Sequence, residues 1–276
     1  MPLSKEDFEV VRKIVRDRSA IILEDGKEYL VEARLNPVAK ELKLADISAL
    51  IQKLKSSSEY LVIQKVVEAM TTNETFFFRD IYPFEALKKN VLPDLLSRRG
   101  PADPLNIWCA ASSTGQEPYT IAMVIAEYFS QFKNNGKLKL IASDINDAVL
   151  SKAKEGIYTQ LEVNRGLPAP LMVKYFQKKV TNWQIKEDIR KMVDYRIINL
   201  CQNLPVLPKM DLVFIRNVLI YFDVETKKKI LAGIRNLLKP DGYLFLGGAE
   251  TTFGIDDQFE RVNYDPAVCY RLIQKK

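Results

Sequence analysis

The chain contains no histidine among its 276 residues, and this absence excludes several kinds of catalytic site. Without an imidazole there is no Ser-His or Cys-His nucleophile pair, no histidine general base and no histidine metal ligand. Cysteine is also scarce: Cys109, Cys201 and Cys269 are far apart, and each lies in an apolar run. This spacing is typical of neither a disulfide framework nor a zinc site. We therefore expect buried thiols in a reducing compartment and no metal centre.

Long hydrophobic runs and a strong charge imbalance are missing as well. No stretch approaches the ~18 uninterrupted apolar residues of a membrane span. The N-terminus has no basic-then-apolar secretion signal. The net charge is +6, from 41 Lys and Arg against 35 Asp and Glu. Such a modest excess suits an acidic partner but does not require nucleic acid. We expect a cytoplasmic protein with no membrane insertion.

The N-terminal part has the apolar spacing of helices, and this spacing predicts an all-helical domain at residues 1–72. One of its helices is expected from about Lys27 to Leu44, with Pro37 kinking or splitting it. Residues 73–104 are expected to form a linker segment and a helix. Residues 105–276 are expected to form a second domain of different architecture.

From Leu105 onward, apolar runs alternate with helical patterns, which predicts an α/β fold with a parallel, doubly wound sheet. The predicted strands are Leu105–Ala111, Lys137–Ser143, Asp194–Leu200, Met210–Ile215 and Gly242–Leu246. A final apolar run, Ala267–Ile273, follows without an intervening helix, so we expect it to be an antiparallel last strand. Runs at Phe176–Val180 and Trp183–Lys186 predict a small β-hairpin subdomain at about residues 174–192, although the whole stretch Gly156–Lys191 is also compatible with helix.

The turn after the first predicted strand is the most informative motif. In a doubly wound sheet this turn is where a nucleotide-like cofactor binds. A dinucleotide site needs G-x-G-x-x-G, but here only Gly115 is present and Glu117 stands at the helix start. An acidic residue there repels a phosphate and attracts a cationic ligand. The alternative is an ordinary tight turn.

The second predicted strand leads into Asp144, at the position where such folds hold ribose hydroxyls. The alternative is a helix cap, in which Asp144 or Asn146 caps the helix that begins near Asp147. Together with Gly115 and Glu117, Asp144 suits an adenosine ligand that carries an ammonium and no phosphate. S-adenosylmethionine fits that description better than NAD.

Two further segments carry polar side chains at element boundaries. Residues 71–80 contain three consecutive phenylalanines with Asn73, Thr75 and Arg79, and the alternative there is a capped helix boundary with a solvated arginine. Residues 216–222 follow a strand, where amino-directed nucleic-acid methyltransferases have an Asn/Asp-Pro-Pro-Tyr motif. Here the prolines are missing, and Tyr221 lies four residues after Asn217. The alternative makes Tyr221 an ordinary half-buried aromatic residue.

These motifs together resemble the CheR family of chemotaxis receptor glutamate O-methyltransferases, and the resemblance covers essentially the whole chain. The segments that carry it are Asn73–Arg79, Ala111–Tyr119, Ala142–Ile145 and Arg216–Phe222. It implies a class I S-adenosylmethionine-dependent methyltransferase, a Rossmann-like doubly wound sheet with an antiparallel last strand. An N-terminal helical domain and a small β-hairpin insertion complete the expected fold. Many members have Glu where this chain has Gln116, but Glu117 is kept.

The resemblance also implies a site for S-adenosylmethionine, with S-adenosylhomocysteine as the product. With Gly115 added from its turn, the expected cofactor-binding residues are Asn73, Thr75, Arg79, Gly115, Glu117, Asp144, Asn199, Leu200, Arg216 and Asn217. Tyr221 matches the tyrosine near the transferred methyl group, so Arg79 and Tyr221 are the expected catalytic residues. A glutamate nucleophile is already ionised at neutral pH and needs no general base, which agrees with a chain that has no histidine.

The implied partners are the cytoplasmic domains of methyl-accepting chemotaxis receptors, which are acidic helical bundles in this family. Arg12, Arg16, Lys27 and Arg34 form a candidate basic face for them, and the alternative is a solvated charged surface. The predicted hairpin is short and has no glycine in its turn, so we expect a monomer that does not depend on a receptor tail peptide. Two rival functions are a non-catalytic cofactor-sensing or receptor-binding module and a nucleic-acid methyltransferase. The merely moderate charge and the missing prolines argue against the latter.

Overall fold

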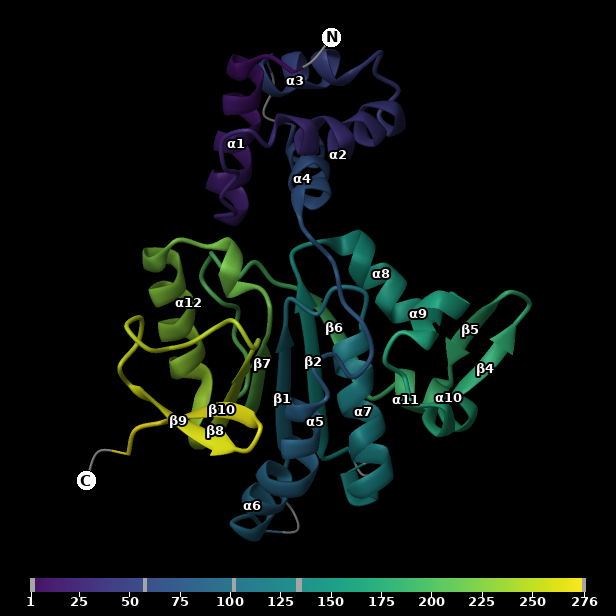
Figure 1. Cartoon of the computed structure of the whole chain (residues 1–276), viewed down its shortest axis with the longest axis vertical. Coiled ribbons are helices and arrows are strands. Elements are labelled where there is room, and N and C mark those ends of the chain that lie inside the picture. The colour runs from purple at the N-terminus through teal and green to yellow at the C-terminus, as the bar shows by residue number, and fades with distance from the viewer. Residues whose placement is uncertain (1–2, 57–58, 101–102, 133–135, 275–276) are drawn as a thin grey trace. The chain divides into compact units, whose positions relative to one another are not determined.

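The computed structural model of the chain describes residues 3–56, 59–100, 103–132 and 136–274 (Figure 1). It divides into two compact units. The first contains Met1–Thr72 together with Tyr221–Thr226, and the second contains Asn73–Ile220 and Lys227–Lys276. Within the described residues, no helix has both the length and the apolar character needed to span a bilayer.

The first unit is helical, because its apolar residues recur on one side of each helix. Its helices are α1 (Lys5–Ser19), α2 (Glu28–Glu41), α3 (Ile47–Ser56) and α4 (Tyr60–Met70). The expected split at Pro37 is wrong, since α2 runs through that residue. Val31, Leu35 and Val38 are all buried, so packing of this stripe keeps the helix continuous despite the missing N–H of Pro37.

The second unit is built on a seven-stranded sheet in the order β6-β2-β1-β7-β8-β10-β9. Its strands are β1 (Leu105–Ala110), β2 (Leu138–Asp144), β6 (Val193–Ile197), β7 (Met210–Ile215), β8 (Leu238–Leu246), β9 (Phe259–Tyr264) and β10 (Ala267–Leu272). The strands from β6 to β8 are parallel, whereas β10 is antiparallel to both β8 and β9. The doubly wound sheet and its antiparallel last strand are therefore confirmed.

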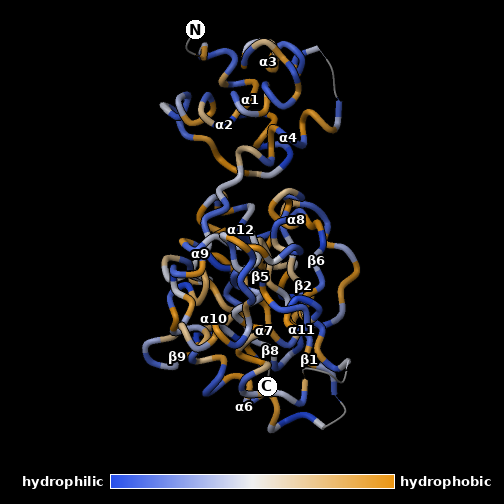
Figure 2. Tube along the Cα trace, turned by 90° about the vertical axis from the view of Figure 1, so that its right-hand side faces the viewer, coloured by the Kyte–Doolittle hydropathy of each residue, from blue (hydrophilic) through white to orange (hydrophobic). Residues whose placement is uncertain are grey.

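Several helices and three short helical turns precede or connect these strands. They are α5 (Tyr82–Ala86), the π-helical turn η1 (Leu87–Val91), α6 (Leu92–Ser97), α7 (Gln116–Tyr128), η2 (Ser130–Phe132), α8 (Asp147–Glu155), α9 (Gln160–Asn164), α10 (Ala169–Tyr175), α11 (Glu187–Arg190), the 3₁₀ turn η3 (Leu219–Tyr221) and α12 (Val224–Leu237). The central strands are covered on both faces, because every residue of β1 and β7 is buried. In Figure 2, orange hydrophobic stretches alternate with blue hydrophilic ones along the trace of this unit.

A hydrophobic core lies on the face of the sheet that α7 covers. It includes alternate residues of the central strands, such as Cys109, Phe214 and Phe245, together with Phe84 of α5. The rings of Phe214 and Phe245 stack with centroids 4.4 Å apart, and Phe84 stacks on Phe214 at 6.4 Å. This packing fixes β1, β7 and β8 relative to one another and so fixes the loops at their carboxyl ends.

A second, three-stranded sheet has the order β3-β5-β4. Strands β4 (Phe176–Lys179) and β5 (Asn182–Ile185) are the two arms of the predicted hairpin. The helical alternative is wrong for these two strands, but other parts of Gly156–Lys191 do form the helices α9, α10 and α11. The third strand, β3 (Ile157–Tyr158), was not expected. It is two residues long, too short to produce an alternating pattern in the sequence.

Other boundaries also differ from the expectation. Strand β6 ends at Ile197 rather than Leu200, and β8 begins at Leu238 rather than Gly242. Strand β9 was not expected at all. Most of its residues are exposed or half-exposed because it is the edge strand beyond β10, so it lacks the apolar run that marks the central strands.

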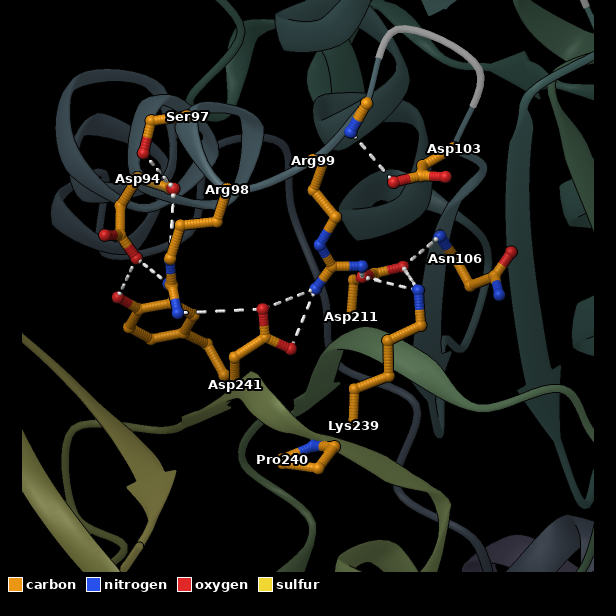
Figure 3. Close-up of polar contacts among 12 residues, drawn as sticks. Asp94, Ser97, Arg98, Arg99, Asp103, Asn106, Asp211, Lys239, Pro240 and Asp241 are labelled. Atoms are coloured by element: carbon orange, nitrogen blue, oxygen red, sulfur yellow. Dashed lines mark hydrogen bonds and ion pairs between the residues drawn. The ribbon is translucent and has the colours of Figure 1, made fainter.

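At the amino ends of the strands, a group of ion pairs surrounds Asp211, the second residue of β7 (Figure 3). The Asp211 side chain is only 1% exposed. It pairs with Arg99 and with Lys239 at 2.9 Å, and it accepts the Asn106 N–H at 2.8 Å. Arg99 also reaches Asp241 at 2.8 Å. This polar cluster ties the segment after α6 to β1, β7 and β8.

Candidate active site

The turn between β1 and α7 is held in a strained and crowded conformation. Ala111, Ser113 and Gly115 all have positive φ, and Gly115 has the largest at 92°. A Cβ on Gly115 would lie 2.8 Å from both the Ala153 Cβ and the Tyr195 hydroxyl. Glycine is therefore required here for its backbone conformation and for its small size. The turn is packed tightly against its neighbours, as expected of a loop that shapes a binding site.

Glu117 lies in the first turn of α7 and is paired with Arg216, which directly follows β7. The Arg216 Nη1 donates to the Glu117 Oε2 at 2.8 Å, and the two side chains are 2% and 13% exposed. Arg216 also donates to the Asp80 carboxylate at 2.7 Å and to the Arg79 carbonyl at 2.8 Å. Burial raises the pKa of Glu117, and the neighbouring Arg216 opposes this rise.

Asp144, the last residue of β2, is 6% exposed. One carboxylate oxygen accepts the Ser113 N–H at 2.9 Å, and the other accepts the Asn146 N–H at 3.0 Å. The side chain that caps α8 is Asn146, which accepts the Val149 N–H. The helix-capping alternative therefore applies to Asn146, whereas Asp144 connects the end of β2 to the turn after β1.

The segment before α5 reaches the same turn. The Asn73 carbonyl accepts a hydrogen bond from the Ser113 hydroxyl at 2.8 Å. Of the three phenylalanines, only Phe77 is fully buried, edge-on to Tyr158 and Phe176. Arg79 donates to the Glu74 carbonyl at 3.0 Å, and its guanidinium lies over the Phe76 ring.

Four of the five parallel strands, β6, β2, β1 and β7, carry the candidate residues at their carboxyl ends, on the edge of the sheet where cofactors bind in such folds. Gly115, Glu117, Asp144 and Arg216 follow or end these strands, and so do Asn199 and Leu200 beyond β6. Asn199 accepts the Cys201 N–H at 3.0 Å, and Leu200 lines a cavity of about 930 Å³ beside α12.

Two expected site residues lie elsewhere in the chain. Thr75 is half-buried. Tyr221 ends η3 and belongs to the first unit.

One residue of this region was missed by the sequence analysis. Glu250 lies four residues beyond β8, and its carboxylate accepts the backbone N–H of Asn217 at 2.8 Å. It stands in an unremarkable polar loop, and no spacing in the sequence connects it to the loop after β7. Only the three-dimensional structure brings the two loops together.

The donors and acceptors at this edge fit S-adenosylmethionine. Within the described residues, the Ser112 hydroxyl and the Asn217 side-chain oxygen are buried without any hydrogen-bond partner. Buried polar atoms left unpaired in a protein alone are typical of a site that a ligand completes. The carboxylates of Glu117 and Asp144 suit an ammonium and ribose hydroxyls, whereas the glycine-rich cradle that a pyrophosphate needs is missing.

Comparison with known proteins also indicates a methyltransferase, along nearly the whole chain. It is 41% identical to Chemotaxis protein methyltransferase 1 of Pseudomonas aeruginosa, over 98% of this chain and 99% of that protein. It is 40% identical to Chemotaxis protein methyltransferase Cher2 of Pseudomonas putida, over 96% and 97%. A chemotaxis protein methyltransferase of Vibrio anguillarum is 36% identical, over 98% of both chains.

Two family models also match. The model "CheR methyltransferase, all-alpha domain" matches residues 6–71, and the model "CheR methyltransferase, SAM binding domain" matches residues 73–268. Together they cover nearly all of both structural units. The chain, with its S-adenosylmethionine-binding sheet domain and its helical N-terminal domain, belongs to the CheR methyltransferase family.

Proposed function

We propose that this enzyme transfers the methyl group of S-adenosylmethionine to glutamate side chains of methyl-accepting chemotaxis receptors, and so tunes receptor adaptation. The products are glutamate methyl esters and S-adenosylhomocysteine. The observation that carries the proposal is the match over nearly the full length of both chains with chemotaxis protein methyltransferases. The chemistry available at the site agrees with it, as follows.

When bound, S-adenosylmethionine supplies a methyl group on a sulfonium sulfur, which a carboxylate oxygen can displace without any proton transfer. A glutamate side chain, with an ordinary pKa of about 4.3, is ready as a nucleophile at neutral pH. The protein therefore has to align the carboxylate rather than activate it, and a chain without histidine can do so.

Arg79 and Tyr221 are the proposed catalytic residues. Within the described residues, the contacts of the Arg79 guanidinium are the Glu74 carbonyl and the Phe76 ring, and no carboxylate pairs with it. It can therefore donate a charge-assisted hydrogen bond to the substrate carboxylate. We assign the Tyr221 hydroxyl a second hydrogen bond to the same group. Both contacts orient the nucleophile, and neither removes a proton from it.

The remaining candidate residues bind the cofactor in this proposal. Glu117 takes the ammonium group, because its second carboxylate oxygen accepts no hydrogen bond within the described residues. Asp144 takes the ribose hydroxyls. The other members of the set are Asn73, Thr75, Arg79, Gly115, Asn199, Leu200, Arg216 and Asn217. Of these, Arg216 acts mainly through Glu117 and Asp80, which it bridges.

The test is methyl transfer from radiolabelled S-adenosylmethionine to receptor cytoplasmic fragments, followed by mild alkaline treatment. Base-labile label that maps to receptor glutamates supports the proposal. If the cofactor binds but no receptor fragment is labelled, the enzyme is instead a cofactor-sensing or receptor-binding module. Base-stable label on added nucleic acid would overturn the proposal and favour a nucleic-acid methyltransferase.

The receptor-docking surface is also part of the proposal. Two of the four basic residues already have partners, since Arg12 pairs with Glu9 at 2.8 Å and Arg34 donates to the Met70 carbonyl at 2.7 Å. The structure gives no such partner for Arg16 or Lys27 among the described residues. These two side chains are thus the better candidates for contacts with an acidic helical bundle.

Charge reversal tests this surface. Arg16→Glu and Lys27→Glu are expected to weaken binding of a receptor fragment, and to reduce the salt dependence of that binding. Lys43→Glu, an exposed site just after α2, is the matched control. Equal affinity and equal salt dependence in all three variants would remove the docking proposal and leave a solvated charged surface.

We further propose that the enzyme does not need a receptor tail peptide as a tether. Strands β4 and β5 pair Lys179 with Asn182, so only Val180 and Thr181 connect them. Val180 has a φ of 44° and is 96% exposed, which leaves a short turn with no loop to close over a peptide. Saturable binding of a receptor tail peptide, with no binding of its scrambled version, would contradict this proposal.

The remaining parts of the proposal concern the state of the protein in the cell. We propose that it acts as a monomer in the cytoplasm, without nucleic acid as a partner. Light scattering coupled to size-exclusion chromatography measures the first property, and cell fractionation measures the second. A dimer mass at micromolar concentration, or recovery in the membrane fraction of receptor-free cells, would count against it.

A further inference from the structure

The loop after β8 places a single carboxylate against the loop after β7. The Glu250 Oε1 accepts the backbone N–H groups of Val218 at 2.9 Å, Leu219 at 2.7 Å and Ile220 at 3.3 Å. Its Oε2 accepts those of Asn217 at 2.8 Å and Gly247 at 2.7 Å. One side chain therefore satisfies four consecutive amides of the loop that leaves β7, and one amide of its own loop.

These amides need such a partner because of where they lie. Residues 217 and 218 belong to no helix or strand, and Leu219 and Ile220 begin the short turn η3, so their N–H groups have no place in a regular hydrogen-bond ladder. Asn217 also has a positive φ of 58°. Asparagine tolerates this conformation better than most residues, but it still requires support from its surroundings. Hydrogen bonds to a carboxylate are stronger than those to a neutral oxygen, so Glu250 supplies that support.

The two loops approach so closely that glycine is required between them. A Cβ on Gly247 would lie 2.8 Å from the Asn217 backbone nitrogen, 2.7 Å from its side-chain nitrogen and 2.8 Å from the Glu250 Oε2. Any side chain at this position would push the loop of Asn217 away from Glu250. Gly247 and Glu250 thus act together to set the position of the loop after β7.

This loop begins and ends with residues of the proposed site. Asn217 stands at its start, with a buried side-chain oxygen that has no partner among the described residues. Tyr221, the proposed catalytic residue, is the next residue in the chain after Ile220. A carboxylate that fixes residues 217 to 220 therefore fixes both the direction of the Asn217 side chain and the point from which Tyr221 continues.

We propose that Glu250 is a positioning residue for cofactor binding and methyl transfer, acting through the backbone of Asn217–Ile220. The inference rests on the proposed function for its catalytic part, but its effect on the cofactor site stands without a methylation substrate. A merely structural role for Glu250 would lower the stability of the sheet domain as a whole. A positioning role instead changes the loop and the cofactor affinity while the sheet stays intact.

The first variant is Glu250→Gln, which keeps the shape but replaces one acceptor oxygen by an amide donor that faces the same N–H groups. Hydrogen exchange of backbone amides 217–220 is expected to accelerate more than tenfold, with β7 and β8 unchanged. The dissociation constant for S-adenosylhomocysteine, measured by calorimetry, is expected to rise about tenfold. A rise of this size corresponds to the energy of about one charge-assisted hydrogen bond. Glu260→Gln is the matched control, since Glu260 is exposed on β9 and pairs only with Arg271 among the described residues.

A second variant, Gly247→Ala, keeps the carboxylate but displaces the loop, and it is expected to give the same local changes. It also takes over the test if Glu250→Gln does not fold. Unchanged exchange at 217–220 and unchanged S-adenosylhomocysteine affinity in the folded variants would overturn the inference. So would an acceleration of exchange spread equally over all strands of the sheet. Failure of the wild-type enzyme to methylate receptor fragments counts against the proposed function alone, because binding and exchange are measured without a substrate.

Discussion

Arg216 and Glu117 form an ion pair of 2.8 Å that is almost completely shielded from water, between the end of β7 and the start of α7. The pair uses one carboxylate oxygen of Glu117. Arg216 is held in turn by Asp80, so the position of Glu117 is fixed before any ligand arrives. A preorganised carboxylate loses little side-chain entropy when it binds a cationic group, and this favours tight binding.

The first prediction concerns the pH dependence of cofactor binding. Burial raises the pKa of Glu117 above that of an exposed glutamate. A ligand with an ammonium group binds the ionised carboxylate, so affinity should be complete above the raised pKa and should fall as the pH is lowered through it. We expect Glu117→Gln to bind S-adenosylhomocysteine about 10–100-fold more weakly at pH 7.5, as for loss of a charged hydrogen bond.

Calorimetric titrations between pH 8 and pH 5 provide the measurement. The affinity of the wild type for S-adenosylhomocysteine should fall as the pH is lowered. In Glu117→Gln the affinity should depend less on pH, because the titrating carboxylate is gone. Identical pH profiles for the two proteins would show that Glu117 does not contact the ammonium group.

The second prediction concerns the two proposed catalytic residues. Arg79→Ala and Tyr221→Phe are each expected to lower kcat at least tenfold, because each removes one of the two hydrogen bonds proposed to orient the substrate carboxylate. The melting temperature should stay within a few degrees of the wild type, since the Arg79 side chain is half-exposed and its guanidinium donates a hydrogen bond only to the nearby Glu74 carbonyl among the described residues. Initial rates of receptor methylation and thermal unfolding curves measure the two effects.

A matched control exists for Arg79. Arg165 also lies over the Phe76 ring, and it pairs with Glu74 at 2.6 Å. Arg165→Ala should therefore reproduce any loss of packing on Phe76 while it leaves the turnover unchanged. Near-normal turnover in both Arg79→Ala and Tyr221→Phe would contradict the catalytic assignment.

The third prediction compares two glycines with positive φ. Gly115→Ala places a Cβ 2.8 Å from the Tyr195 hydroxyl, whereas Gly26→Ala meets nothing within 4 Å. Both variants carry the cost of a left-handed residue, roughly 1–2 kcal/mol, and Gly115→Ala adds a steric clash. We expect Gly115→Ala alone to lose S-adenosylhomocysteine binding. Similar affinities in both variants would mean that the turn after β1 does not shape the cofactor site.

The fourth prediction separates stability from activity. Asp211→Asn leaves Arg99 and Lys239 without their buried acceptor, and breaking such a pair costs about 3–5 kcal/mol. The melting temperature should fall by about 2–4 °C for each kcal/mol. Activity per folded molecule should be unchanged, because this polar cluster lies at the amino ends of the strands (Figure 3). Asp241→Asn, at a 32% exposed side chain, should cost far less.

Denaturant unfolding, with rates corrected for the folded fraction, measures both quantities. A loss of stability no larger for Asp211→Asn than for Asp241→Asn would show that burial does not strengthen this cluster. A fall in kcat of Asp211→Asn at full folding would show that the two ends of the sheet are coupled.

The sequence is sufficient to predict those structural elements whose residue pattern follows directly from the fold. Met210–Ile215 was predicted with the observed bounds, because a strand covered on both faces reads as a continuous apolar run. The antiparallel last strand followed from the missing helix before Ala267. Gly115 and Glu117 stood out because a cofactor turn constrains residue types at fixed positions along the chain.

What the sequence could not predict depends on contacts between distant residues. The Arg34 guanidinium of the candidate basic face donates to the carbonyls of Met70 and Thr71 at the end of α4, some 36 residues away. Glu250 meets the loop after β7 from 33 residues further along the chain. Neither partner is marked by any local pattern. The edge strand β9 was missed because its exposed residues give no apolar signal.

The three cysteines differ in their exposure to solvent, and this difference provides a natural site for a fluorescent label. Cys109 and Cys269 are buried, and burial raises the pKa of both thiols, that of Cys269 to about 12. Cys201 is only half-buried. A maleimide dye added at neutral pH should therefore react there first, next to Leu200 in the loop after β6. If Leu200 lines the cofactor site as proposed, the fluorescence of this label would change when the cofactor binds, with no engineered cysteine.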